Sequence, residues 1–137
     1  MVDAVSHEFN ATDDAVFLAL AGSAARVGIA GYCFGFTLAA TGLLGLFHPP
    51  FHLPAHAAPV IAGICMLGAI PPVLAGRQLR AGALCLRAVA TTTGDDITHL
   101  MAAVDGLQRA FTTLVAMLAV HGVGLAVVVA LMFPRGA

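Results

Sequence analysis

The sequence predicts an all-α integral membrane protein with three transmembrane helices, of which the second and third extend into an antiparallel cytoplasmic helical hairpin. Three observations lead to this prediction. Hydrophobic residues make up 60% of the chain and charged residues only 9%, against roughly 25% charged residues in soluble domains. Residues 27–47, 57–76 and 110–133 contain no charged side chain and are each long enough to span a bilayer. Finally, five of the six arginines fall at the same side of these spans.

The domain organisation predicted is a short flexible N-terminus, residues 1–12, followed by one three-helix membrane domain over residues 13–137. The first helix should begin near Thr12 or Asp13, with the Thr12 hydroxyl as the N-cap and acidic residues in the first turn. No lysine or arginine precedes Arg26, whereas a secretory signal peptide begins with a positive region. We therefore expect the N-terminus to be retained.

The arginines predict the orientation in the membrane. The entrance to the first span, the exit of the second and the entrance to the third share one side, and they carry Arg26, Arg77, Arg80, Arg87 and Arg109. The positive-inside rule then predicts a cytoplasmic N-terminus, a cytoplasmic hairpin over residues 77–109 and an external C-terminus. The chain uses arginine without lysine and is rich in alanine, which is typical of a GC-rich bacterial genome. The location predicted is the bacterial inner membrane.

The first span carries Gly31, Gly35 and Ala39 at four-residue spacing. Small residues at this spacing clear one side of a helix, so that another backbone can approach closely. The sequence predicts a packing face here, either against another subunit or against the other helices of the same chain.

The loop after the first span is rich in proline and contains His48, His52 and His56. Proline excludes a regular helix, so a metal site would need the loop to fold and gather the three imidazoles. A copper or zinc site is one interpretation. The favoured one is a loop at the membrane surface with histidines facing water, because no carboxylate or cysteine lies nearby as a further ligand.

The second span contains Pro71 and Pro72 shortly before its charged end. Each proline removes a backbone donor, so a kink is expected there. The arginine-bearing segment that follows should pack against the first part of the third helix and bring its arginines near Asp105 or its neighbours. The apolar residues expected to make this contact are Ile97, Leu100, Met101, Val104, Leu107 and Phe111.

Several polar residues of the third helix form a predicted cytoplasmic docking surface: Asp95, Asp96, His99, Asp105 and Arg109. The first two aspartates and the histidine are spaced so that they could share a ligand on one helical turn. The favoured interpretation of the aspartates is N-terminal capping and interaction with the helix dipole. Asp105 and Arg109 are four residues apart and are expected to form a surface ion pair.

His121 lies near the middle of the third span, where a polar side chain facing lipid would be costly. The favoured interpretation is structural, with the imidazole bonded to a carbonyl or to the hydroxyl of Thr37 or Thr41. A second is axial ligation of heme or a chlorophyll-type pigment, with Met66 as an opposite ligand. A third is a pore or proton path.

The sequence contains no nucleotide-binding, nucleophile-elbow or zinc-protease motif, so we do not expect an enzyme. Six arginines confined to the membrane boundary are too few for nucleic-acid binding. The function expected is that of a non-catalytic inner-membrane subunit, surrounded by lipid, that assembles with itself or with a larger membrane complex. The alternatives are a heme- or pigment-binding subunit and a homo-oligomeric pore.

Overall fold

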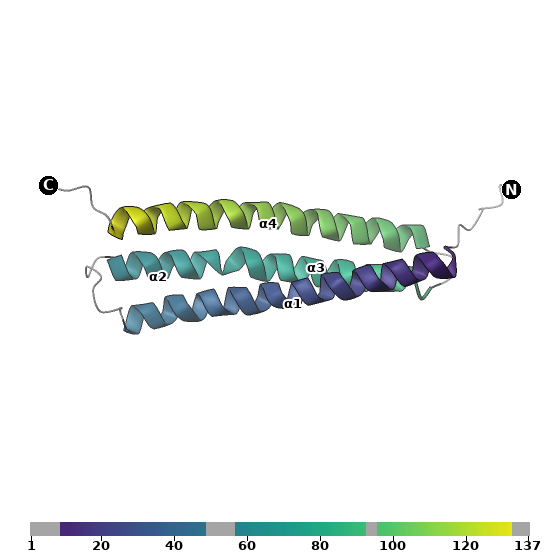
Figure 1. The fold of residues 1–137 in the computed structure, drawn as a ribbon, viewed down its shortest axis with the longest axis horizontal. Coiled ribbons are helices and arrows are strands. Elements are labelled where there is room, and N and C mark those ends of the chain that lie inside the picture. The colour runs from purple at the N-terminus through teal and green to yellow at the C-terminus, as the bar shows by residue number, and fades with distance from the viewer. Residues whose placement is uncertain (1–8, 49–56, 93–95, 133–137) are drawn as a thin grey trace.

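The computed structural model describes residues 9–48, 57–92 and 96–132, and over these residues it is helical without strands. The helices are α1 (Ala11–Phe47), α2 (Ala57–Gly68), α3 (Ile70–Val89) and α4 (Asp96–Met132). They form three long rods, with α2 and α3 sharing one rod (Figure 1). All three rods are long and apolar enough to cross a membrane, which confirms the predicted helical class and is consistent with a multi-pass membrane protein.

Helix α1 begins two residues before the predicted start. Its N-cap is Asn10 rather than Thr12: the Asn10 side chain accepts hydrogen bonds from the backbone N–H groups of Thr12 and Asp13. The Asp13 carboxylate in turn accepts from the Asn10 N–H at 3.3 Å, which completes a capping box. Two residues satisfy three N-terminal donors here, which explains why asparagine takes the cap.

The second rod is interrupted at Ala69, between α2 and α3. Pro71 and Pro72 lie in the first turn of α3, so neither can donate to the carbonyls of the preceding turn. The Ala69 N–H is shared between the carbonyls of Cys65 (3.1 Å) and Met66 (3.3 Å). The two prolines therefore interrupt the helix immediately before them, where carbonyl oxygens of the preceding turn have no backbone N–H donor.

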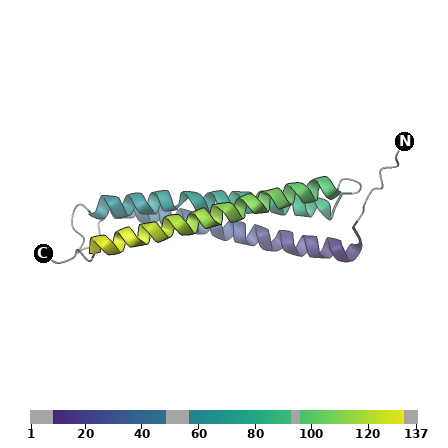
Figure 2. The ribbon, with the colours of Figure 1, turned by 90° about the horizontal axis from the view of Figure 1, so that it is seen from above.

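The rod made of α2 and α3 lies between α1 and α4 (Figures 1 and 2). A small hydrophobic core at the N-terminal end of α1 joins all three rods, through Ala21 and Ala24 of α1, Ala83 and Leu86 of α3 and Ala103 of α4. The N-terminal half of α1 therefore packs on the other helices.

Helices α1 and α3 approach closely because glycine lines their contact. On α1 the buried residues Ala21, Gly28, Gly35 and Gly42 recur every seven positions. A Cβ added at Gly28 would lie 2.8 Å from the carbonyl oxygen of Gly76, and one added at Gly76 would lie 2.6 Å from that of Gly28. No side chain fits between these two backbones, which is the packing expected of small residues in membrane helices.

The predicted packing residues of the first span also face this chain's own helices. A Cβ on Gly31 would meet the Pro72 carbonyl oxygen at 2.8 Å, and one on Gly35 would meet that of Ala69 at 2.9 Å. Ala39 is half-buried on the same helix. Since the space in front of both glycines is filled by α3 and the helix break, this face packs within the chain.

Helices α3 and α4 also meet through small residues. The Cα of Gly82 would lie 3.3 Å from a Cβ added at Gly106, and Ala103 and Ala110 of α4 are fully buried. This differs from the contact expected from the sequence, in which larger apolar side chains of α4 faced α3. Close backbone packing selects the small residues and leaves most of the large ones outside.

Candidate assembly surface and buried histidine

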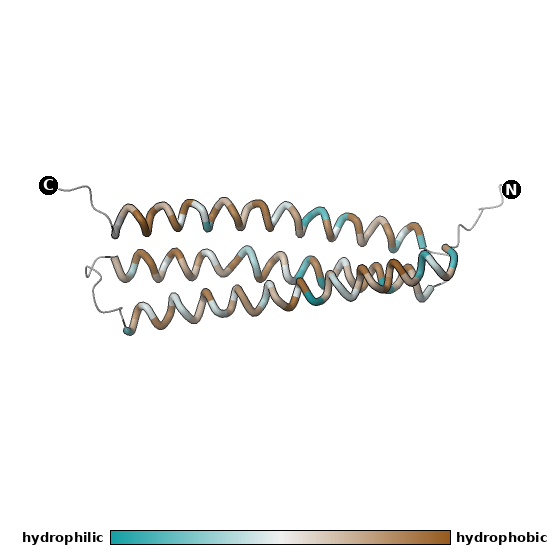
Figure 3. Tube along the Cα trace, viewed as in Figure 1, coloured by the Kyte–Doolittle hydropathy of each residue, from teal (hydrophilic) through white to brown (hydrophobic). Residues whose placement is uncertain are grey.

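Polar residues on the three rods gather at one level along the long axis, near its middle (Figure 3). The Cγ of Arg80 on α3 lies against Gly28 of α1, and its guanidinium carbon lies 6.0 Å from the centre of the Tyr32 ring. Two residues before Arg80, Gln78 contacts Thr113 of α4. We call this the arginine level, defined by Arg26, Arg77, Arg80 and Arg109, which are all exposed.

Helices α3 and α4 are joined by a hydrogen bond between polar side chains: the Thr113 hydroxyl donates to Oε1 of Gln78 at 2.9 Å. It is partly buried beside a polar cavity of about 290 Å³, into which Asp105, Gln108 and Thr112 also face. The Arg109 carbonyl oxygen of its own helix also lies 2.9 Å from the Thr113 hydroxyl, whose single proton is shared between the two acceptors. This contact fixes the register of α3 against α4 at the arginine level.

Asp105 and Arg109 form the ion pair expected from their spacing. Nη2 of the Arg109 guanidinium lies 2.8 Å from the Asp105 carboxylate; the Arg109 side chain is 69% exposed and the Asp105 side chain 57%. Among the described residues, Asp105 has no ion pair with an arginine of α3, contrary to the expected approach of residues 77–87. Exposed pairs of this kind contribute about 0–1 kcal/mol.

The other predicted docking residues lie at the start of α4. Asp96 is only 5% exposed, and its Oδ1 has no hydrogen-bond partner among the described residues. His99 is half-buried. Asp95 lies outside the described residues. Within residues 9–48, 57–92 and 96–132, no three histidine, cysteine or acidic side chains are close enough together to hold a metal ion.

The predicted histidine loop lies mostly outside the described residues. His52 and His56 belong to the segment 49–56, about which the structure gives no placement. His48 is described: it is exposed, and its backbone N–H donates to the Leu44 carbonyl oxygen at 2.8 Å at the end of α1.

His121 of α4 is half-buried, and its ring lies near Gly68 of α2 and Phe34 of α1. Its Nδ1 is 2.7 Å from the carbonyl oxygen of Met117, one turn earlier on α4. The imidazole must donate from Nδ1 in this contact, so in the neutral ring Nε2 is an acceptor. That Nε2 is buried and has no hydrogen-bond partner among the described residues. Nε2 lies against Gly68, 3.4 Å from the position of an added Cβ, and the centre of the imidazole ring lies 5.8 Å from the centre of the Phe34 ring.

The partners predicted for His121 are placed elsewhere. The hydroxyls of Thr37 and Thr41 donate to carbonyls of their own helix, those of Cys33 and Thr37, both at 2.8 Å. These hydroxyls are therefore engaged within α1, and the partner of the imidazole is a backbone carbonyl.

Met66, predicted as a ligand opposite His121, lies next to a different residue. Its Cγ lies next to Gly42 of α1, 2.9 Å from where a Cβ would be. His121 instead contacts Gly68, which stands two residues further along and so on another side of the helix.

A continuous row of exposed residues runs along α4. Its members are spaced alternately four and three residues apart, the spacing of a coiled-coil seam. We call it the outer stripe: Ile97, Met101, Val104, Gln108, Phe111, Val115, Leu118, Gly122, Leu125 and Val129.

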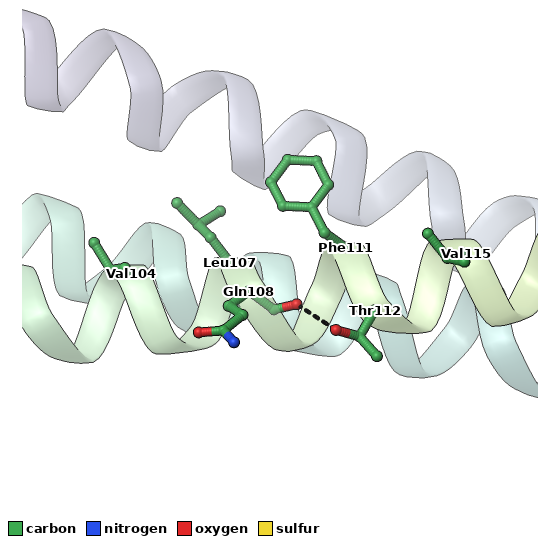
Figure 4. Close-up of a pocket in the computed structure, with 6 residues that line it drawn as sticks. All are labelled: Val104, Leu107, Gln108, Phe111, Thr112 and Val115. Atoms are coloured by element: carbon green, nitrogen blue, oxygen red, sulfur yellow. Dashed lines mark hydrogen bonds between the residues drawn. The ribbon is translucent and has the colours of Figure 1, made fainter.

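The outer stripe is hollowed where it crosses the arginine level. A shallow surface depression, open to the outside and with a volume of about 490 Å³, is lined by six residues of α4 alone, namely Val104, Leu107, Gln108, Phe111, Thr112 and Val115 (Figure 4). The Thr112 hydroxyl donates to the Gln108 carbonyl oxygen at 3.0 Å, so it is turned back onto the helix. The hollow presents mostly apolar side chains, with the Gln108 amide as its free polar group.

The outer stripe was not predicted from the sequence. The apolar residues predicted to face α3 belong to two rows: Leu100 and Leu107 pack on the core cluster, whereas Ile97, Met101 and Phe111 are 56–64% exposed. Both rows continue at heptad spacing along the span, so the spacing alone does not distinguish them. Their burial in the structure does.

Comparison with protein families, with characterised proteins and with solved structures gives no match to this chain.

Proposed function

We propose that this chain is a non-catalytic membrane subunit that assembles with another protein through the outer stripe of α4. The observation that carries the proposal is the length of the stripe. It begins at Ile97, twelve residues before Arg109, and continues to Val129. Residues on the N-terminal side of the arginine level would lie beyond the hydrocarbon core, where lipid cannot cover them.

The distances support this division. From Ala110 to Val129 the helix rises roughly 30 Å, which is about the thickness of the hydrocarbon core. The segment from Ile97 to Arg109 then extends roughly 18 Å further. Within it, Ile97, Met101 and Val104 are 56%, 64% and 50% exposed. Large apolar side chains aligned on one side of a helix in water favour a protein partner.

The proposed orientation places the arginine level at the cytoplasmic boundary of a bacterial inner membrane. Five arginines at or before this level support it by the positive-inside rule. The N-terminus and the extension formed by α3 and α4 would then be cytoplasmic.

The proposal is tested by purifying the protein from its native membrane in mild detergent and measuring the mass of the particle. We expect a complex larger than one chain. Val104→Asn, placed on the stripe beyond the arginine level, should weaken it. Leu84→Asn is the matched control, because Leu84 of α3 is 68% exposed but lies off the stripe. A stable monomer with no bound protein would refute the proposal.

A second candidate function is the binding of heme or a chlorophyll-type pigment at His121, supported by the free acceptor at Nε2. A porphyrin ligated by this nitrogen would need the space that Gly68 occupies, so α2 and α4 would have to separate. This requirement makes it the weaker candidate. An absorption spectrum of natively purified protein without a Soret or chlorin band, unchanged in His121→Ala, would exclude it.

A further inference from the structure

We propose that the partner on the outer stripe is a second copy of this chain, packed in parallel and in register through α4. This inference rests on the assembly role proposed above and specifies the partner. The outer stripe keeps to one side of α4 from Ile97 to Val129 at alternating steps of four and three residues, which is the spacing found where two helices pack with a left-handed twist.

The distribution of arginines favours a parallel arrangement of the two copies. Because Arg135 alone stands opposite five arginines at the other end of the spans, the charge bias is strong and each copy should insert in the same direction. Two copies that meet through α4 must then be parallel. In a parallel, in-register pair every residue of the stripe faces its own counterpart, so the stripe needs to be complementary to itself.

The composition of the stripe meets this condition. It contains no charged residue, so no like charges face each other. Its single polar side chain is Gln108, whose amide can donate to and accept from an identical amide. The nearest charges, Asp105 and Arg109, are already paired with each other on the side of the helix. One polar residue at such a position specifies a parallel register at some cost in stability.

The exposed area is sufficient. The eight large apolar residues of the stripe are 48–68% exposed. At roughly 200 Å² for a fully exposed large side chain, they offer on the order of 900 Å² per chain, close to the roughly 800 Å² that each partner buries in a stable interface. The hollow of about 490 Å³ beside Gln108 and Phe111 adds room for side chains of the second helix to enter.

Cysteine cross-linking in native membranes tests the inference, on a background in which Cys33, Cys65 and Cys85 are replaced by alanine. Met101→Cys lies on the stripe, and Ala102→Cys is its matched control, exposed at almost the same depth on another side of α4. Facing Cα atoms about 6 Å apart can form a disulfide. We expect at least ten times more disulfide-linked dimer from Met101→Cys than from Ala102→Cys.

A second variant keeps the native cysteines. Gln108→Glu would place two carboxylates opposite each other, so the dimer should dissociate at pH 7 with a dissociation constant raised at least tenfold. Because a glutamate carboxyl protonates near pH 4.3, the dimer should re-form below about pH 4. Gln108→Leu should remain associated at both pH values.

Four outcomes separate this inference from the assembly role. Preferential cross-linking at Met101 together with dissociation of Gln108→Glu supports both. A native dimer that cross-links better at Ala102 overturns the stripe as its interface, and with it the assembly surface proposed above. A complex with a different protein that is weakened by Val104→Asn, without self-cross-linking, overturns the second copy and leaves the assembly role standing. An unaccompanied monomer overturns both.

Discussion

The glycine contact between α1 and α3 gives a sharp prediction for Gly76→Ala. The added Cβ would lie 2.6 Å from the carbonyl oxygen of Gly28, about 0.8 Å short of the 3.4 Å at which ordinary contact begins. A backbone oxygen cannot rotate away, so the two helices must separate locally. Overpacking of this kind costs about 1–3 kcal/mol, against a gain of up to about 1 kcal/mol from replacing glycine by alanine within a helix. We expect a net loss of about 1–2 kcal/mol.

The matched control is Gly22→Ala on α1, where an added Cβ would meet nothing within 4 Å. There the helix propensity acts alone, and a gain of about 0.5–1 kcal/mol is expected. Thermal unfolding in mild detergent can be followed with a thiol-reactive fluorophore on a background in which Cys33, which is exposed, and Cys65 are replaced by alanine, since the half-buried Cys85 packs against the hydrophobic core and becomes more accessible on unfolding. The prediction is that Gly76→Ala unfolds below, and Gly22→Ala at or above, the temperature of the native protein. If Gly76→Ala unfolds at the same temperature as Gly22→Ala or higher, the close approach of the two helices is wrong.

Two further predictions concern polar contacts near the arginine level. A double-mutant cycle with Gln78→Leu and Thr113→Val should give a coupling free energy of about 0.5–1.5 kcal/mol, measured by the same unfolding assay, because the bond joining these side chains is partly buried; a coupling of zero would contradict the bond. Replacing Arg109 by glutamine should change stability by less than about 1 kcal/mol, since its pair with Asp105 is largely exposed, and a loss above 2 kcal/mol would show that Arg109 has another partner.

The sequence was sufficient to predict the helical class, three helices long enough to span a membrane and the extent of α4. These features depend on local signals. Runs of apolar residues set the spans. Pro71 and Pro72 predicted a kink, and the structure has an interruption between α2 and α3 at Ala69, whose backbone angles stay in the right-handed helical region. The cap of α1 was placed two residues late because Asn10 and Thr12 are both good caps, and only the reciprocal bond from Asp13 distinguishes them.

The sequence was less informative about which side of each helix packs against its neighbours. The expectation for α4 followed the rule for soluble helices, in which large apolar residues face the partner. Within this bundle the contacts are made by Ala103, Gly106 and Ala110, because small residues let the backbones approach. Most of the large residues, apart from Leu100 and Leu107, are left outside, and a single sequence does not say whether lipid or protein covers them. Whether lipid or protein covers a residue of the stripe depends on which side of the arginine level it lies. That level is defined only once the three rods are aligned with one another.

His121 can be tested as a stabilising residue by replacing it with leucine. The Met117 carbonyl that accepts from Nδ1 also lies in the helix ladder, so losing the imidazole leaves it with its backbone donor. Removing the unpaired Nε2 relieves a buried acceptor, which is worth about 1–3 kcal/mol. His121→Leu should therefore unfold at the same temperature as the native protein or higher, while His121→Ala should unfold lower because it leaves a void beside Phe34 and Gly68. If leucine proves clearly destabilising, Nε2 has a partner in the membrane, and that partner becomes the first target for identifying a ligand. If leucine stabilises, the imidazole is not needed for folding, and the search for function returns to the outer stripe.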